Sequence, residues 1–186
     1  MTTTTINHGV ATTKVREPLN TRSLASWMVN QPEIHAAFGY TIQSESLALA
    51  IEVRQFGFGQ SNPTYLLKTQ VENKHLMSWV LRKKPRKVAH ASAHGLHREF
   101  KVLTALERHN NLHPDKHVPI PKLYAYCRDE SVLGAEFYIM EYVEGRIFTQ
   151  PSLPGVTLEH RKSAFRNVLE VLANIHKVDL AHVGLE

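Results

Sequence analysis

Arg82 and Glu99 are the side chains whose types and positions first suggest chemistry. Arg82 ends a strand predicted over 75–82, where period-two alternation puts it on the same face as Val80. Glu99 falls inside the apolar arc of a helix predicted over 93–109, and a carboxylate facing a core is unfavourable unless a cation pairs with it. Arg82 is the nearest suitable cation in the inferred topology. We therefore predict an Arg82–Glu99 ion pair, the alternative being two solvent-exposed side chains.

A turn containing two glycines lies earlier in the chain. Gly57 and Gly59 stand between two predicted strands, whereas the glycines of a dinucleotide-binding fold open a helix. Glycines between strands let backbone N–H groups approach a phosphate, as in the loop that covers ATP in kinases. The alternative is a hairpin turn whose glycines supply positive φ.

The segment 136–143 is an apolar strand that runs into the polar residues Glu144 and Gly145. Backbone groups just past the end of a strand are available to hydrogen-bond a planar ligand such as adenine. The alternative is an edge strand that enters a loop.

The elements that must position these groups follow from hydrophobic periodicity. Alternating apolar residues predict strands, and apolar residues three and four apart predict helices. The predicted strands cover 47–56, 65–70, 75–82, 120–127 and 136–143, and the predicted helices cover 21–30, 93–109 and 158–178. In the simplest topology the first three strands form an antiparallel meander.

Taken in order, these motifs resemble the kinase-like aminoglycoside phosphotransferase and choline kinase superfamily, and in particular the N-terminal kinase-like domain of the long fused acyl-CoA dehydrogenases. The likeness covers about residues 40–186 and is carried by QFGFGQSNPTYLL at 55–67, WVLRKKP at 79–85, HREFKVLTAL at 97–106, VPIPKLYAYCRDESVLGAEFYIMEYVEGRIF at 118–148 and NIHKVD at 174–179. The implied fold class is α+β: a protein-kinase-like N-terminal lobe with a five-stranded antiparallel sheet plus one helix, followed by the first helix of an incomplete C-terminal lobe.

The resemblance implies an ATP site and gives roles by position. Gln60, Ser61 and Asn62 match the tip of the loop that covers the nucleotide. Arg82 stands where most kinases carry the phosphate-binding lysine, and Glu99 is similar to the glutamate that pairs with it.

An adenine pocket is implied in the same way. Met140 matches the residue at its back, and the backbones of Glu141 and Val143 would hydrogen-bond the adenine edge. Val80 is included among the predicted nucleotide-binding residues.

The family also uses a histidine-x-aspartate loop, a downstream asparagine and a further aspartate to act on the substrate hydroxyl and hold Mg²⁺. The sequence has only Asp115, Asp129 and Asp179, none of them in such a loop. We therefore predict no catalytic residue and no metal ligand in this chain, with Mg²⁺ used only by full-length relatives. The chain alone is expected to be inactive, whereas full-length relatives would phosphorylate a small-molecule hydroxyl, such as that of a hydroxyacyl-CoA. The alternative is a non-catalytic, pseudokinase-like interaction module.

The predicted organisation has four parts. They are a disordered tail at 1–18, a helical segment at 19–41, the kinase-like lobe at 42–148, and a linker with the first helix of a truncated second lobe at 149–186. The last predicted helix carries an apolar stripe of Phe165, Leu169 and Leu172. Because an apolar stripe without packing partners promotes association, we expect self-association through this helix.

Histidines and a basic run allow two other interpretations. Zinc ligands could come from either of two sets at helical spacing, which are His90, His94 and His97, and His109, His113 and His117. Gly95 lies within the first set and Pro114 interrupts the second. The basic run 82–87 could bind nucleic acid, but no aromatic residues interleave it for base stacking. We expect neither a metal nor a nucleic acid to bind.

The composition excludes several protein classes. The 186 residues are 42% hydrophobic and 21% charged with a single cysteine, which argues against a membrane protein, a disulfide scaffold, a coiled coil or a wholly disordered chain. A net charge of +5 favours anionic partners without selecting one. With no clear targeting signal, the expected compartments are the cytoplasm, mitochondria or peroxisomes.

Overall fold

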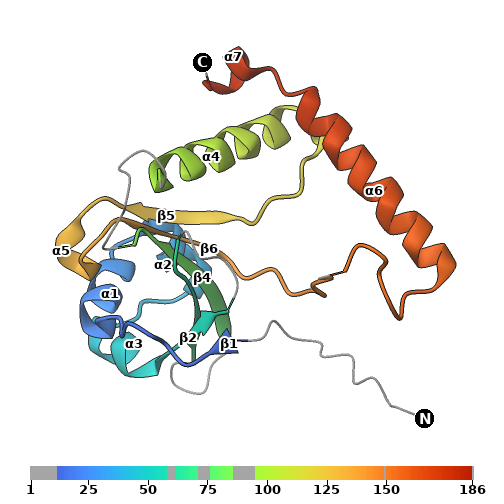
Figure 1. Cartoon of the computed structure of the whole chain (residues 1–186). Helices are drawn as coiled ribbons and strands as arrows, with labels where there is room; N and C mark the ends of the chain where they lie inside the picture. Colours follow the sequence, from blue (N-terminus) through green and yellow to red (C-terminus); the bar gives the residue numbers. More distant parts are fainter. Residues whose placement is uncertain (1–11, 58–61, 71–75, 86–94, 149, 186) are drawn as a thin grey trace, which may run out of the picture. The chain divides into compact units, whose positions relative to one another are not determined.

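The computed structural model of the chain describes residues 12–57, 62–70, 76–85, 95–148 and 150–185 (Figure 1). The chain divides into two compact units. The sheet unit comprises Ala11–Phe100 and Pro121–Val143, and the helical unit contains Lys101–Ile120 and Glu144–Glu186. Glu99 therefore belongs to the same unit as the strands.

An antiparallel sheet forms the centre of the sheet unit. Its strands are β1 (Thr12–Thr13), β2 (Ile51–Phe56), β3 (Thr64–Thr69), β4 (Met77–Lys83), β5 (Leu123–Cys127) and β6 (Phe137–Glu141). They lie in the order β1-β2-β3-β4-β6-β5, and each neighbouring pair is antiparallel. β4 is thus central, flanked by β3 and β6.

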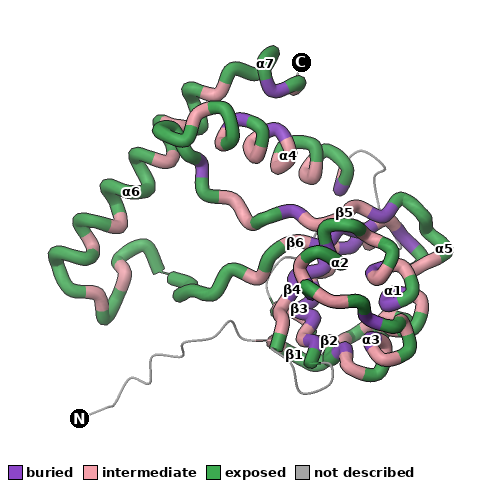
Figure 2. The backbone as a smooth tube through the Cα atoms, turned by 180° about the vertical axis from the view of Figure 1, so that it is seen from behind, coloured by how far each residue is buried: buried purple, intermediate pink, exposed green. Residues whose placement is uncertain are grey.

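Short helices pack on one face of this sheet. They are α1 (Thr21–Met28), α2 (Pro32–Phe38), α3 (Ser44–Ala50) and α5 (Glu130–Leu133). One buried cluster joins Leu24 and Leu47 of these helices to Trp79, Leu81 and Phe137 of the sheet. Figure 2 shows buried stretches of backbone in both the helices and the strands. Because side chains alternate along a strand, the residues between these sheet positions lie on the opposite face.

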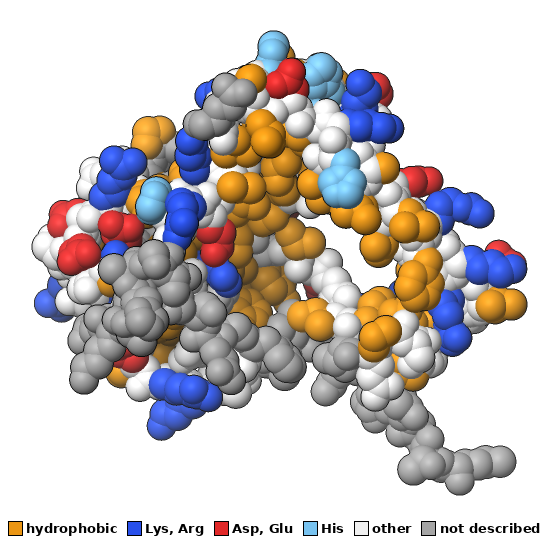
Figure 3. Space-filling view, turned by 45° about the horizontal axis from the view of Figure 1, so that its top comes forward, with side chains coloured by type: hydrophobic (Ala, Val, Ile, Leu, Met, Phe, Trp, Pro, Cys, Tyr) orange, Lys and Arg blue, Asp and Glu red, His pale blue; other side chains and the backbone are white. Residues whose placement is uncertain are grey.

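The helical unit is built from longer helices. α4 (Leu96–Leu112) begins in the sheet unit, and a single 3₁₀ turn (Pro114–Lys116) follows it. α6 (Leu158–His176) is capped by Thr157, whose hydroxyl accepts a hydrogen bond from the N–H of His160, and α7 (Leu180–Val183) comes after it. Several large apolar side chains of α6 are exposed, and hydrophobic side chains are visible at the surface in Figure 3. Among the described residues, no helix is both long and apolar enough to cross a bilayer.

The structure corrects the first predicted strand, 47–56. Ser44–Ala50 form α3, and β2 begins only at Ile51. Leu47 is fully buried, whereas Leu49 is 91% exposed, although both were expected on one buried face. Leu47 and Ile51 are four residues apart, so their spacing fits a helix face as well as a strand face. The run of Ser, Glu, Leu and Ala before Ile51 then favours the helix.

The sheet has six strands rather than the expected five, and α4 is not its only helix. The extra strand, β1, lies in the segment that was expected to be disordered. Thr12 and Thr13 pair with Phe56 and Gln55, and the N–H of Arg16 donates to Gln55 Oε1 at 3.0 Å. These contacts join residues about forty positions apart, which a local pattern does not reveal. Residues 1–11 lie outside the described part of the chain.

Candidate functional site

Three neighbouring strands bring Thr64, Arg82 and Tyr138 side by side. Thr64 of β3 is the direct cross-strand partner of Arg82 of β4, and Arg82 is the partner of Tyr138 of β6. Direct partners in an antiparallel sheet share a face, with Cβ atoms roughly 5 Å apart. Their chain neighbours, such as Leu81, belong to the buried cluster under the helices. The three side chains therefore lie on the face that those helices leave open.

Arg82 and Glu99 form the predicted ion pair on this face. Glu99 lies in the first turn of α4, and Arg82 Nε is 2.6 Å from Glu99 Oε1. The two side chains are 27% and 32% exposed, so solvent still reaches both. Because partly exposed ion pairs add little stability, this contact matters chiefly for where it holds the guanidinium. The role of the two residues in nucleotide binding stays a prediction.

Two hydroxyl groups complete this cluster. Thr64 Oγ1 accepts a hydrogen bond from Arg82 Nη1 at 3.1 Å and donates one to the carbonyl of Asn62 at 3.1 Å. The hydroxyl of Tyr138 donates to Glu99 Oε1. Burial, together with this bond to Glu99, raises the pKa of Tyr138 far above its usual range, so its hydroxyl stays a donor. Sequence reasoning missed both residues, because only the strand register shows that they flank Arg82.

An apolar surface lies beside the ion pair. Val80 and Met140 are direct cross-strand partners, each two residues from Arg82 and Tyr138 respectively. Val80 is 6% exposed and Met140 is half-buried. Alternation puts both side chains on the face that carries Arg82. The structure thus brings together Val80, Met140, Arg82 and Glu99 from the predicted set.

The hydrogen bonds at the end of β6 limit which backbone groups could bond an adenine edge. The N–H of Glu141 donates to the carbonyl of Lys122 at 2.8 Å, and Glu141 Oε2 accepts from the N–H of Lys122 at 3.0 Å. Glu141 could therefore meet a base only through its carbonyl. Val143 lies past the strand, is 60% exposed, and its N–H makes no hydrogen bond within the described residues.

The glycine turn joins β2 to β3. Gly57 is exposed, whereas Gly59, Gln60 and Ser61 lie outside the described residues. Asn62 is 6% exposed, and its side-chain Oδ1 is buried without a hydrogen-bond partner in the described part of the chain. Through the Thr64 hydroxyl, the carbonyl of Asn62 is linked to Arg82.

The aspartates of the chain occupy local structural positions. Asp129 Oδ1 caps α5 by accepting from the N–H of Ser131 at 2.9 Å, which lowers the pKa of this carboxyl. Asp179 Oδ1 caps α7 by accepting from the N–H of His182 at 3.1 Å. Asp115 lies in the 3₁₀ turn. Asp129 and Asp179 therefore each stabilise the start of a short helix, through one carboxylate oxygen.

The histidines and the basic run were the alternative binding sites. His109 is buried with Nε2 3.2 Å from the carbonyl of Lys116, and its ring lies 5.1 Å from that of His113. No group of three potential metal ligands occurs among the described residues, and His90 and His94 lie outside them. Lys83 of the basic run is 2% exposed and 3.9 Å from Glu17, so the run is not one continuous exposed patch.

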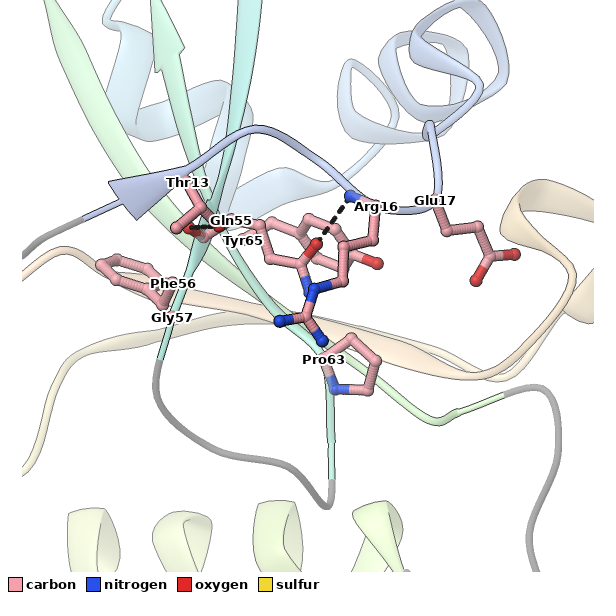
Figure 4. A pocket seen from close by; sticks show the side chains of 8 residues that line it. All are labelled: Thr13, Arg16, Glu17, Gln55, Phe56, Gly57, Pro63 and Tyr65. Atoms are coloured by element: carbon pink, nitrogen blue, oxygen red, sulfur yellow. Dashed lines mark hydrogen bonds between the residues drawn. The ribbon is translucent and has the colours of Figure 1, made fainter.

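A polar pocket on the other face of the sheet was not predicted. It has a volume of about 490 Å³ and is lined by Thr13, Arg16, Glu17, Gln55, Phe56, Gly57, Pro63 and Tyr65 (Figure 4). Tyr65 belongs to the buried cluster under the helices, so this pocket is separated by the sheet from Arg82. It forms where the segment after β1 crosses β2, a contact that local sequence patterns do not show.

Curated relatives share this part of the chain. The sequence is 45% identical over 135 residues to "Probable acyl-CoA dehydrogenase IBR3" of Arabidopsis thaliana, covering 73% of this chain and 16% of that protein. It is 38% identical over 136 residues to "Acyl-CoA dehydrogenase family member 11" of Homo sapiens, covering 73% and 16%. The chain thus spans about a sixth of the length of these relatives.

A solved structure shares the fold. It is the crystal structure of a Ralstonia eutropha protein described as a candidate aminoglycoside phosphotransferase. The match has a TM-score of 0.64 and 33% sequence identity, and it covers 90% of this chain and 41% of that one. The α+β, kinase-like fold class is therefore confirmed, with the strand count corrected as above. A family model described as "Phosphotransferase enzyme family" matches residues 52–186, and on these grounds the chain belongs to that family.

Proposed function

We propose that this chain is the nucleotide-binding lobe of a small-molecule kinase that takes its phosphoryl group from ATP. The observation that carries this proposal is the Arg82–Glu99 ion pair beside the apolar surface of Val80 and Met140. A cation held by a carboxylate next to an apolar surface suits a ligand with a flat base at one end and phosphates at the other. Membership of a phosphotransferase family supports the same chemistry.

Each site residue would contact a different part of the nucleotide. Arg82 would pair with phosphate oxygens through charge-assisted hydrogen bonds, while Glu99 keeps its guanidinium in place. Val80 and Met140 would contact the faces of the base, and the free N–H of Val143 would bond its edge. Mg²⁺ would supply charge neutralisation between the phosphates when bound, and we expect full-length relatives to provide its ligands.

We also propose a substrate class for full-length relatives. The acceptor would be a hydroxyl group on a small molecule, such as a hydroxyacyl-CoA. The support is that the curated relatives are acyl-CoA dehydrogenases by name and that the family is one of phosphotransferases. In the transfer, the bond from the γ-phosphorus to the bridging oxygen of ATP breaks, a bond to the acceptor oxygen forms, and the hydroxyl proton is released.

This chain by itself is expected to bind nucleotide without transferring phosphate. The reason is that two of its three aspartates cap helices and the third lies in a 3₁₀ turn, so each aspartate has a local structural position. Incubation of the chain with ATP, Mg²⁺ and a hydroxyacyl-CoA should give no phosphorylated product by mass spectrometry. Product above a no-enzyme blank would contradict this expectation.

The binding proposal is tested by titrating the chain with ATP and with adenosine. Arg82→Ala should weaken ATP binding by about 10- to 100-fold, because a charge-assisted contact to phosphate is lost, while adenosine binding changes by less than about twofold. Arg54→Ala is the matched control, since Arg54 is an exposed β2 arginine 3.7 Å from Glu52. Equal ATP affinity in wild type and Arg82→Ala would refute the proposed role of Arg82.

The alternative function is a non-catalytic interaction module. Exposed apolar side chains along α6, including Phe165, Leu169 and Leu172, are the observation that favours it. This alternative predicts capture of a partner through α6 without phosphoryl transfer, and it does not require ATP. Because self-association through α6 is expected of both functions, ATP binding that depends on Arg82 is the result that favours the nucleotide-binding lobe.

A further inference from the structure

We propose that Thr64 and Tyr138 are positioning residues that hold Arg82 in the orientation needed to meet the phosphates of a nucleotide. This inference rests on the proposed function and deepens it, because it names two residues that would act on the ligand through Arg82. The two side chains lie on either side of Arg82 in three adjacent strands, in direct register.

An arginine at this position must be held in a defined orientation, whereas a lysine ammonium needs only a defined position. Its guanidinium is a rigid, planar fork with five N–H donors on three nitrogens, so its direction as well as its position decides what it can bind. Glu99 contacts only one edge of the fork, at Nε. Although Nε lies 2.6 Å from Glu99 Oε1, it makes no hydrogen bond to a described residue, so the ion pair alone does not set the direction of the plane and a second contact is needed.

Thr64 supplies that second contact. Its hydroxyl has one proton, which goes to the carbonyl of Asn62 at 3.1 Å. The oxygen can therefore meet Arg82 Nη1 only as an acceptor, and it lies 3.1 Å away. Nε lies against Glu99 without a hydrogen bond, Nη1 is bonded to Thr64, and no described residue hydrogen-bonds Nη2. The orientation of the fork is thereby fixed with one nitrogen available to an anion.

Tyr138 acts on the other partner of the ion pair. Its hydroxyl donates to Glu99 Oε1, the same oxygen that contacts Arg82 Nε. The Tyr138 ring is 1% exposed and packs against Phe100 with centroids 5.4 Å apart, so the hydroxyl approaches from a fixed direction. Because burial raises its pKa, Tyr138 remains a donor at every physiological pH. Glu99 Oε1 therefore has two neighbours, the hydroxyl of Tyr138 and Nε of Arg82.

The same contacts link the ion pair to the glycine turn. Asn62 stands at the end of that turn, and the path from its carbonyl runs through the Thr64 hydroxyl to Arg82 and then to Glu99. A shift of the Asn62 carbonyl would therefore move the Thr64 hydroxyl and, through it, the Arg82 guanidinium. This connection is the reason why loss of a small hydroxyl group should affect binding of a charged ligand.

The test uses variants that remove one hydroxyl with little change in shape, titrated with ATP and with adenosine. Thr64→Val and Tyr138→Phe should each weaken ATP binding by about tenfold, in line with loss of a hydrogen bond to a charged group. Thr64→Ser keeps the hydroxyl and should restore wild-type affinity to within about twofold. Adenosine, which has no phosphates, should bind all of these variants as it binds the wild type.

Tyr126→Phe is the matched control. Tyr126 is the cross-strand partner of Tyr138 on β5, packs on the same Phe100 ring, and donates to a different carboxylate, that of Glu136, at 2.7 Å. Its loss should leave ATP affinity unchanged.

Three results would overturn the inference. Unchanged ATP affinity in both Thr64→Val and Tyr138→Phe would show that Arg82 does not depend on the hydroxyls. Equal weakening of ATP and adenosine binding would assign the effect to general packing. Absence of ATP binding by the wild-type chain would remove the proposed function as well, which separates the two failures.

Discussion

The arginine at position 82 is the residue on which the proposed nucleotide binding depends. A guanidinium presents parallel N–H groups that match two oxygens of a phosphate, whereas an ammonium acts as a point charge. The structure surrounds this fork with Glu99, Thr64 and Tyr138, each in contact with it or with its carboxylate partner. In the proposed function, specificity for an anionic ligand would thus depend on a few hydrogen bonds around one side chain.

A pH dependence follows from the raised pKa of Tyr138. A tyrosine in the unfolded chain ionises near pH 10, whereas burial and the bond to Glu99 keep Tyr138 protonated to higher pH in the folded chain. Its contribution to stability is therefore complete below about pH 10 and is lost as the pH rises beyond that value. The free energy of unfolding in urea should fall between pH 9 and 11, and fall less steeply in Tyr138→Phe. Parallel pH profiles for the two proteins would refute this account.

Among the secondary-structure elements, the junction of α3 and β2 tests the fold most simply. Leu47 and Leu49 have the same side chain and stand two residues apart, but Leu47 is fully buried and Leu49 is 91% exposed. Leu47→Ala should lower the free energy of unfolding by about 2–5 kcal/mol, because it leaves a cavity in the core. Leu49→Ala should change it by less than about 0.5 kcal/mol. Equal effects would indicate the alternating strand that the sequence pattern predicts instead.

The same elements show which parts of the site could be predicted from the sequence. Arg82 and Glu99 could be paired from the sequence because each breaks a clear apolar pattern, one at a strand end and one in a helix arc. Thr64 and Tyr138 could not, since their place beside Arg82 depends on strand register, which turn lengths and long-range pairing decide. The strand β1 escaped prediction for the same reason. α3 was predicted as part of a strand because Leu47 and Ile51, four residues apart, lie on one face of either a helix or a strand.

For the whole molecule, the exposed face of α6 predicts behaviour in solution. Phe165, Leu169 and Leu172 are 51%, 65% and 45% exposed, which is unusual for three large apolar residues along one helix. We expect a second copy of the chain to cover this face. Sedimentation equilibrium should therefore show self-association of the wild type, and Leu169→Glu should shift the population to monomer.

The control for this prediction is Asn167→Glu, which adds the same charge at an exposed polar position of α6. It should leave the self-association unchanged. A wild-type chain that is monomeric over the whole concentration range would show that α6 has no such role.

The central claim, that Arg82 meets the phosphates of a nucleotide, is tested most directly by the Nε–Hε resonance of Arg82 in a ¹⁵N-correlated NMR spectrum, assigned with Arg82→Lys. Saturating ATP should shift this resonance, and saturating adenosine should leave it in place, because only ATP brings phosphates to the guanidinium. An Arg82 resonance unmoved by ATP, under conditions in which other resonances show that ATP is bound, would contradict the account.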